Sequence, residues 1–343
     1  MQVWLIILII LVAMILAALA ILFTRIRTMS SIKRIGKTLY RVNYRANYKL
    51  DKLLQKGVND VAKLTSFVSK HIFFGYPIKV KEQISGCSSF AATAPDGDLL
   101  AGRNFDYPKT SQLLVHTKPK KGYASYSMVC LAHLGISEEG GTSPESLMGK
   151  AMILASPFAC VDGMNEKGLH VAVLELTTKP TAQNTGKTPI ITTVSVRMLL
   201  DKCATTDEAV EMLSNYDMFS SAGSPYHFLI TDATGNTVII EWPDPDQTMV
   251  VLPQSYVTNF QLAEGNFKGA GGGEERYKII ENALDKSQHT LSEDDVMKVL
   301  QAVRVEFNGN WGTIWSIVYN ISEKSMKIRC NTDYENIYKI ESL

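Results

Sequence analysis

The cysteine at position 87 has the sequence setting of a reactive thiol. Cys87 follows Gly86 and precedes two serines, whereas Cys130, Cys160 and Cys203 lie in or beside apolar runs, where a cysteine is usually a small core residue. A thiol attacks a carbonyl carbon only as the thiolate, and its ordinary pKa is about 8.5. Cys87 therefore needs a base or a nearby positive charge if it is to act as a nucleophile at neutral pH.

Cleavage of the peptide bond before Cys87 would supply such a base. The new α-amino group, with an ordinary pKa of about 7.7 to 8.0, can take the thiol proton and later give it to a leaving amine. Gly86 suits a sterically open scissile bond, because glycine tolerates unusual backbone geometry at low cost. Two charged residues follow in the next segment: Asp106 can hold the amino group, and Arg103 can favour a thiolate or bind a substrate carbonyl.

A hairpin is predicted to bring these groups together. If residues 95–98 (PDGD) form the turn, Cys87 lies opposite Asp106 on the neighbouring strand. Arg103 is three residues from Asp106 and points to the other face of a regular strand, so a bulge near Asn104 is needed to bring both to the cysteine. The spacing by itself favours a structural ion pair between Arg103 and Asp106 over a catalytic role.

Composition indicates a globular chain without a strong electrostatic field. The 343 residues are 45% hydrophobic and 20% charged, with a net charge of +1, so a large core is expected and nucleic acid is not an expected partner. The five cysteines are odd in number and widely spaced, which fits neither a disulfide framework nor a CxxC metal site and favours a reducing compartment. We expect no metal and no cofactor.

The N-terminus carries a candidate membrane anchor. Residues Val3 to Phe23 are uncharged and apolar, long enough as a helix to cross a hydrocarbon layer of about 30 Å. A cleaved signal peptide is the alternative, but the basic segment that normally opens one is missing. Basic residues follow the run and none precedes it, so a single-pass anchor with a cytoplasmic catalytic domain is predicted. These residues are Arg25, Arg27, Lys33, Arg34, Lys37, Arg41 and Arg45.

The remaining pattern predicts an α+β domain behind this anchor. We expect an anchor and basic juxtamembrane segment at 1–37, a helical pro-segment at 38–86 and a catalytic domain at 87–343. Apolar spacing suits an amphipathic helix over 39–72. Strands are predicted at 88–94, 99–106, 151–155, 169–176, 226–231, 237–242, 248–252, 255–260, 313–320 and 325–330. Helices are predicted at 193–203, 206–215, 274–286 and 293–303. Antiparallel hairpins without regular βαβ alternation indicate a layered α+β fold.

Several motifs resemble those of the choloylglycine hydrolase family of N-terminal-nucleophile amidases, or linear amide C–N hydrolases. The resemblance begins with GCSSF and GRNFDY, which set Arg103 and Asp106 at the family's distances from Cys87. It continues, in the family's order, through nearly everything after residue 86. The later motifs are DGMNEKGLHVAVLEL (162–176), YVTNF (256–260), EERYKII (274–280) and TIWSIVYN (313–320).

The resemblance implies a four-layer αββα sandwich and a role for each matching residue. Cys87 becomes the nucleophile after the precursor cuts itself between Gly86 and Cys87, and Arg103 and Asp106 match the charged residues beside it. Asn259 matches the asparagine that donates to the oxyanion. Arg276 matches a late active-site arginine. Glu175 occupies a position where bile salt hydrolases have asparagine and the ceramide and acylethanolamide branch has a carboxylate, and this argues against bile-salt specificity.

The predicted activity is hydrolysis of a linear non-peptide N-acyl amide by a membrane-tethered enzyme. The tether suggests a lipid-like acyl group. The sequence leaves open acyl transfer to another amine, a Cys/His thiol hydrolase that needs no chain cleavage, an inactive membrane-anchored binding protein, and the oligomeric state. His170 and His227 lie on strand-like segments and are interpreted as packed or surface histidines.

Overall fold

The computed structural model describes residues 2–73, 75, 76, 85–137, 141–221 and 223–343. Within these residues, two large sheets make up most of the domain. The nine-stranded sheet has the order β1 (Lys33–Arg34), β2 (Leu39–Tyr44), β5 (Gln112–Thr117), β6 (Ser125–Cys130), β7 (Cys160–Asn165), β8 (His170–Glu175), β11 (Tyr226–Thr231), β12 (Thr237–Glu241) and β13 (Val250–Leu252). The six-stranded sheet has the order β14 (Tyr256–Val257), β3 (Gly86–Thr93), β4 (Leu99–Pro108), β17 (Trp311–Asn320), β18 (Ser325–Cys330) and β19 (Tyr338–Ile340). Two short pairs accompany them in the described chain: β9 (Thr188–Ile191) with β10 (Tyr216–Phe219), and β15 (Asn259–Phe260) with β16 (Gly271–Gly272).

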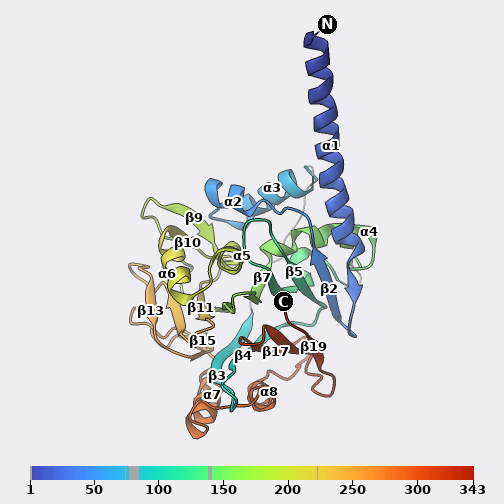
Figure 1. Ribbon diagram of the computed structural model, residues 1–343. Helices are drawn as coiled ribbons and strands as arrows, with labels where there is room; N and C mark the ends of the chain where they lie inside the picture. The colour runs from blue at the N-terminus through green and yellow to red at the C-terminus, as the bar shows by residue number, and fades with distance from the viewer. Residues whose placement is uncertain (1, 74, 77–84, 138–140, 222) are drawn as a thin grey trace.

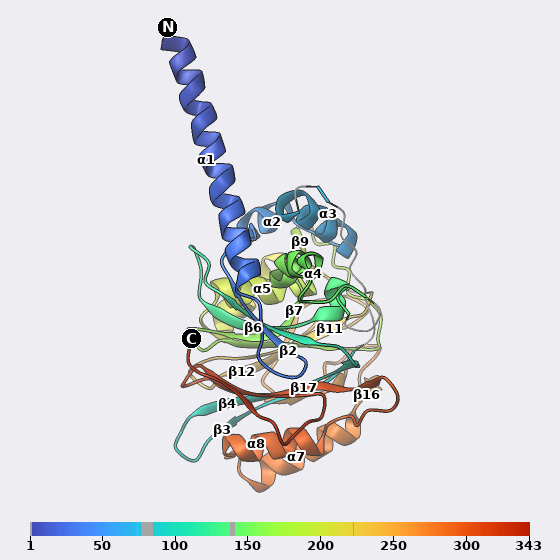
Figure 2. The same ribbon diagram turned by 90° about the vertical axis from the view of Figure 1, so that its right-hand side faces the viewer.

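The two large sheets pack face to face and helices cover their outer faces (Figure 2). Helix α5 (Thr192–Lys202) packs on β7 and β8, and β8 packs on β3 of the other sheet. On the far side, α7 (Glu274–Lys286) packs on β3, and α8 (Glu293–Ala302) packs on β4 and β17. Helix, sheet, sheet and helix therefore follow one another, the layered α+β arrangement that the resemblance implied.

The remaining helices surround the nine-stranded sheet. They are α1 (Gln2–Ser30), α2 (Leu50–Lys56), α3 (Val61–Ile72), α4 (Leu147–Met152), α6 (Thr206–Ser214) and the short 3₁₀ helices at Leu131–Leu134 and Ile153–Phe158. The four helices predicted after residue 86 are confirmed. Two begin at side-chain caps, since the side chains of Thr205 and Ser292 accept hydrogen bonds from the backbone N–H groups of Glu208 and Asp295.

Two predictions of secondary structure are wrong. Residues 151–155 are helical, because an apolar run of that length fits a buried helical turn as well as a strand. Residues 39–72 do not form one helix: the segment begins with β2, which lies inside the nine-stranded sheet and pairs in parallel with β5. Leu39, Tyr40 and Val42 are all fully buried, so the apolar spacing there comes from a strand covered on both faces. Residues 74 and 77–84 of the predicted pro-segment lie outside the described residues.

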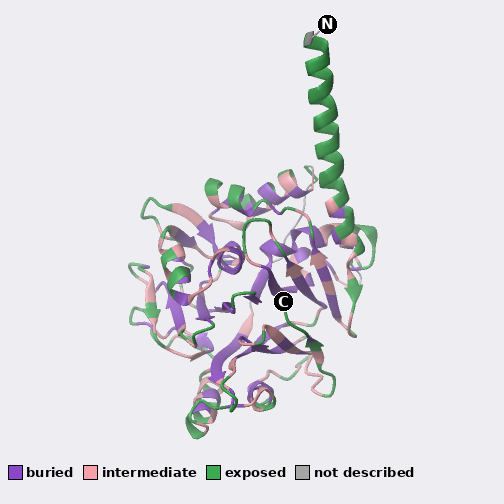
Figure 3. Ribbon diagram, in the orientation of Figure 1, coloured by how far each residue is buried: buried purple, intermediate pink, exposed green. Residues whose placement is uncertain are grey.

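Helix α1 projects from the domain at the end opposite α7 and α8 (Figures 1 and 2). Its apolar window is 0% buried, as the exposed colour in Figure 3 shows, and its length and hydropathy suffice to cross a membrane. The last turns are fixed to the domain: Arg25 donates to the carbonyl of His71 at 2.8 Å, and Thr28 Oγ1 accepts from the N–H groups of Arg45 and Ala46 at 2.9 and 3.1 Å. The direction in which α1 leaves the domain is therefore set by specific contacts.

Candidate active site

The β3–β4 hairpin has a register one residue away from the predicted one. Gly86 lies opposite Asp106 and Cys87 lies opposite Phe105, so the predicted pairing of Cys87 with Asp106 is wrong. The turn is longer than a two-residue turn because Gly97, with φ of 95°, adds a residue in the left-handed region. In this register Cys87 and Arg103 share one face of the sheet without the bulge that we expected near Asn104, and Asp106 stays on the opposite face.

Cys87 is enclosed between the two sheets. The residue is fully buried, and its Sγ lies 3.9 Å from the carbonyl oxygen of Val173 on β8. Burial raises the pKa of the Cys87 thiol to about 11, and the nearby guanidinium of Arg103 only partly offsets that rise. In the uncut chain this thiol is therefore protonated at neutral pH.

Arg103 reaches the cysteine from the same face and is held by a buried carboxylate. Its Nε donates to Asp162 Oδ2 at 3.3 Å and its Nη2 donates to the carbonyl of Val173 at 2.7 Å. Tyr319 and Trp315 also donate to Asp162, at 2.5 and 3.2 Å. Among the described residues, Nη1 of Arg103 has no hydrogen-bond partner. A buried, oriented donor is thus left to interact with a thiolate or a substrate oxygen.

Asp106 acts on the opposite face of the six-stranded sheet. Its carboxylate accepts a hydrogen bond from Thr313 Oγ1 at 2.6 Å and forms an ion pair with Arg276 Nη1 at 3.2 Å. A Cβ added to Gly86 would lie 2.8 Å from Asp106 Oδ2. Glycine is therefore required here by the close approach of a carboxylate, and the unusual backbone conformation that we expected is not its reason. Burial raises the pKa of Asp106, which Arg276 opposes.

Asn259 and Arg276 hold the backbone of Cys87. The predicted strand 255–260 is divided between β14, which pairs with β3, and β15, which pairs with β16, and Asn259 stands just after the break. Its Oδ1 accepts from the Cys87 N–H at 2.7 Å and from Arg276 Nη2 at 2.8 Å. Arg276 Nη1 donates to the Cys87 carbonyl at 2.8 Å. We expected Asp106 to hold the Cys87 amino group after cleavage. In the structure, the Cys87 N–H is bound by Asn259.

Glu175 contacts both sides of this arrangement. Its carbonyl accepts from Asn259 Nδ2 at 2.8 Å. Its carboxylate accepts from the N–H and the hydroxyl of Ser85 at 2.5 and 2.8 Å. The side chain therefore binds the chain two residues before Cys87, a contact that the sequence did not predict.

The structure joins all six predicted residues in one network, as three pairs. Cys87 and Arg103 lie between the sheets, whereas Asp106 and Arg276 approach from the helix-covered face, and Asn259 and Glu175 connect to the Cys87 backbone and to Ser85. Sequence reasoning missed Asp162, Thr313 and Ser85 as partners. Asp162 was within a quoted motif, but its strand, β7, was not predicted. Its position beside Arg103 therefore could not be inferred from the sequence.

The histidines do not provide a base for Cys87. Both ring nitrogens of His227 are occupied, by Glu241 Oε1 at 2.8 Å and by the carbonyl of Thr258 at 2.7 Å. His170 is fully buried against the ring of Tyr319, and burial lowers its pKa to about 3. In the described part of the chain no histidine nitrogen bonds to the thiol, and both residues are packed, as interpreted from the sequence.

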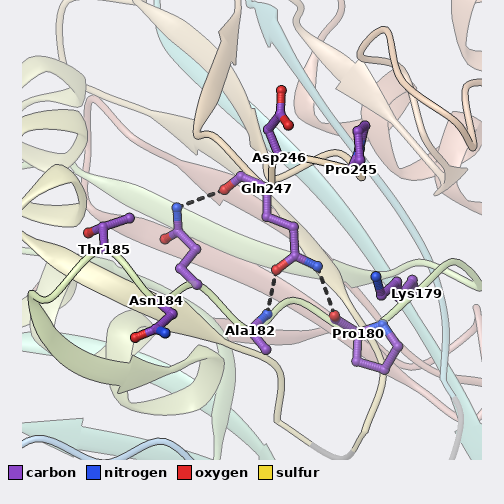
Figure 4. A pocket seen from close by; sticks show the side chains of 9 residues that line it. Lys179, Pro180, Ala182, Asn184, Thr185, Pro245, Asp246 and Gln247 are labelled. Carbon is purple, nitrogen blue, oxygen red and sulfur yellow. Dashed lines mark hydrogen bonds between the residues drawn. The ribbon is translucent and has the colours of Figure 1, made fainter.

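A separate depression of about 420 Å³ lies beside the loop that follows β8 (Figure 4). Its polar groups already bind one another: Gln247 Oε1 accepts from the Ala182 N–H, and Gln247 Nε2 donates to the carbonyl of Pro180. None of the six site residues lines it. Gln247 therefore bridges the two loops that form the depression, and we assign the depression no role in the chemistry.

Comparison with known proteins identifies the family. The model of the family described as acyl-coenzyme A:6-aminopenicillanic acid acyl-transferase matches residues 92–334. Two structures of mutants of the conjugated bile acid hydrolase from Clostridium perfringens are similar, each with 17% identity over 74% of this chain and 92% of that chain, with TM-scores of 0.53 and 0.51. Penicillin V acylase from Agrobacterium tumefaciens matches 74% of this chain and 86% of that chain with 16% identity and a TM-score of 0.46.

The chain belongs to this family of N-terminal-nucleophile enzymes. The match spans well over half of the chain and includes Arg103, Asp106, Glu175, Asn259 and Arg276, but it begins after Cys87. The predicted class, an enzyme acting on linear non-peptide carbon–nitrogen bonds, is thereby confirmed. The roles of the individual residues rest on the geometry above.

Proposed function

We propose that this chain is the precursor of an N-acyl amide hydrolase that cuts itself between Gly86 and Cys87. The observation that carries the proposal is the constrained Cys87 backbone: its N–H is bound by Asn259 Oδ1 at 2.7 Å and its carbonyl by Arg276 at 2.8 Å. Both ends of the residue are oriented before any cut is made. The residue that must become a chain end is therefore already held in place.

Self-cleavage follows from attack of the Cys87 sulfur on the Gly86 carbonyl carbon. A carbon–sulfur bond forms, the carbon–nitrogen bond breaks, and the thiol proton passes to the departing nitrogen of Cys87. Water then hydrolyses the thioester, which leaves a Gly86 carboxylate and a free Cys87 with its own α-amino group. Asp106 lies directly behind Gly86, where its carboxylate can bind the new ammonium group.

Turnover reuses the same groups on an external amide. The Cys87 amine accepts the thiol proton, the thiolate attacks the substrate carbonyl, and the amine product leaves with a proton from that same group. We assign Asn259 Nδ2 as the oxyanion donor and the unpartnered Nη1 of Arg103 as a second stabilising group. Water completes the cycle by hydrolysing the acyl-enzyme. Attack by another amine in place of water would give acyl transfer, the reaction in the family's name.

Glu175 limits the charge that a substrate can carry near its amide. In the precursor its carboxylate binds Ser85, and a local shift of the new chain end at Gly86 after the cut would leave that carboxylate facing the substrate. An anionic group close to the scissile bond is then repelled, whereas a neutral or cationic one is accepted. We therefore propose an uncharged N-acyl amide with a lipid-like acyl chain, which α1 as a membrane anchor would bring within reach.

The pro-segment is expected to remain attached after the cut. Strand β2 lies between β1 and β5 in the large sheet, and Leu53, Leu64 and Phe67 of α2 and α3 are buried in the core. Breaking the chain at residue 86 removes none of these contacts. Fragments 1–86 and 87–343 should therefore co-purify and separate only in denaturant. Quantitative release of the larger fragment by a carbonate wash would contradict this docking.

Two measurements test the proposed activity. Mass spectrometry of the folded protein should find a fragment whose N-terminus is Cys87. Cleavage of an N-acylethanolamine should exceed that of the N-acylglycine with the same acyl chain, and Glu175→Gln should reduce the difference. A Cys/His hydrolase would instead be active as one uncut chain. Failure to cleave any N-acyl lipid while soluble penicillin V is cleaved would contradict the lipid-like substrate.

Maturation and turnover should differ in their dependence on pH. Since the pKa of the Cys87 thiol in the precursor is about 11, the thiolate fraction rises about tenfold for each pH unit below that value. Self-cleavage should accelerate accordingly from pH 6 to pH 9. Amide hydrolysis should level off near pH 8, where the chain-end amine becomes neutral. Timed gel analysis of fresh precursor and assays of mature enzyme give the two profiles. Identical profiles would contradict the proposal that the chain-end amine acts as the base only after the cut.

A further inference from the structure

A basic cavity lies where α1 joins the domain. It has a volume of about 580 Å³ and is formed by the chain after β2, the start of α2, the β5–β6 hairpin and the end of α5. Six of its seven cationic lining residues come from two walls, the α2 side and the hairpin. They are Arg45, Lys49, Lys52, Lys118, Lys120 and Lys121, and the seventh, Lys202, ends α5.

The positive charge of this cavity is not neutralised from within. The two acidic residues in its lining are already engaged: Asp51 pairs with Lys202 at 2.7 Å, and Asp201 pairs with Arg197 at 2.7 Å. Asp201 also accepts from Tyr48 at 2.5 Å. Within the described chain, the side chains of the six cationic residues make no ion pair or hydrogen bond. Such a group of cations at one opening favours an anionic ligand.

The position of the cavity indicates which anion this is. Thr28 of α1 accepts from the N–H groups of Arg45 and Ala46, so one edge of the cavity lies against the helix. Thr28 is five residues after Phe23, the last residue of the apolar run, which corresponds to roughly 7.5 Å along a helix. The polar layer of a bilayer extends about 5 to 8 Å beyond its hydrocarbon core. The cavity is therefore at headgroup depth when α1 spans the membrane.

We infer that this cavity binds the phosphate of an anionic phospholipid headgroup from the leaflet nearest the domain. The inference rests on the proposed membrane anchor. Lysine ammonium groups donate to phosphate oxygens, and an anionic leaflet attracts basic segments near its surface. Figures 1 and 2 show α2 on the same side of the domain as α1. Headgroup binding would therefore fix the rotation of the domain against the bilayer, a constraint that one helix alone does not impose.

Binding of short-chain lipids to the full chain in a non-ionic detergent tests this inference. Calorimetry with dihexanoyl phosphatidylglycerol should give an affinity about tenfold or more above that for dihexanoyl phosphatidylcholine or inorganic phosphate. The combined change Lys49→Gln, Lys52→Gln and Lys120→Gln should remove most of that preference. The matched control is Lys278→Gln, Lys286→Gln and Lys339→Gln, three exposed lysines outside the cavity lining, and it should bind as the parent does.

Three results would contradict the inference. Equal affinity for the two lipids, or no effect of the cavity variant, would exclude a headgroup site, and phosphate binding as tight as phosphatidylglycerol would indicate a small-anion site. Failure of the anchor is seen separately, because a carbonate wash would then release the uncut Cys87→Ala chain. The calorimetric comparison still decides whether the cavity selects a lipid headgroup, since short-chain lipids reach it without a bilayer.

Discussion

Cys87→Ala is expected to stop both self-cleavage and amide hydrolysis. The thiol is the attacking group in each reaction, and loss of a nucleophile typically costs about 10⁴-fold or more in rate. The protein should accumulate as one uncut chain of 343 residues. Its fold should persist, because the change removes one buried sulfur atom and leaves the N–H bond to Asn259 in place. Gel analysis after expression and an assay with an N-acyl lipid measure the two effects.

Cys130→Ala is the matched control for this change. Cys130 is also fully buried and a free thiol, but it makes no contact with the six site residues among the bonds described above. This variant should cleave itself and turn over at close to the parent rate. An active Cys87→Ala protein, or a parent that stays uncut while active, would contradict the proposal. A parent that neither cuts itself nor reacts at Cys87 with an electrophilic acyl probe would indicate an inactive binding protein.

The hairpin shows how far local sequence signals determine the site. The turn residues and alternating strands were sufficient to predict that Cys87 and Arg103 lie on paired strands. They did not determine the register, because one extra turn residue at Gly97 moves every pair by one position. That shift places Arg103 on the face of Cys87 and removes Asp106 from it. The roles of the two charged residues were therefore separable only in the structure.

Strand β2 could not be predicted from the sequence because its partner strand lies far away along the chain. Leu39 to Tyr44 pair in parallel with residues 112–117, and a parallel partner so far away leaves no turn signal in the sequence. Asp162 was missed for a related reason, since its bond to Arg103 joins strands of different sheets. The predicted helices α7 and α8 carried local periodicity, and α8 also a capping serine, Ser292; both helices were found as predicted.

Asn259→Asp is expected to separate self-cleavage from turnover. The substitution keeps an oxygen that accepts from the Cys87 N–H and from Arg276, as Asn259 Oδ1 does at 2.7 and 2.8 Å. Cleavage of the chain should therefore continue. It removes the Nδ2 amide, which donates to the Glu175 carbonyl at 2.8 Å in the precursor and which we assign to the oxyanion during turnover. Loss of one oxyanion donor lowers kcat by about 10² to 10³-fold. KM should change little, because the lost bond forms fully only in the transition state.

Asn259→Ala removes both functions and completes the comparison. This variant loses the acceptor for the Cys87 N–H as well as the donor, so cleavage should slow along with turnover. Asn308→Asp applies the same chemical change at an exposed site and should leave both rates unchanged. If Asn259→Asp instead hydrolyses amides at the parent rate, the oxyanion must be bound by other groups, of which Arg103 Nη1 is a candidate. If Asn259→Ala still cuts itself at the parent rate, the backbone of Cys87 is oriented by Arg276 alone.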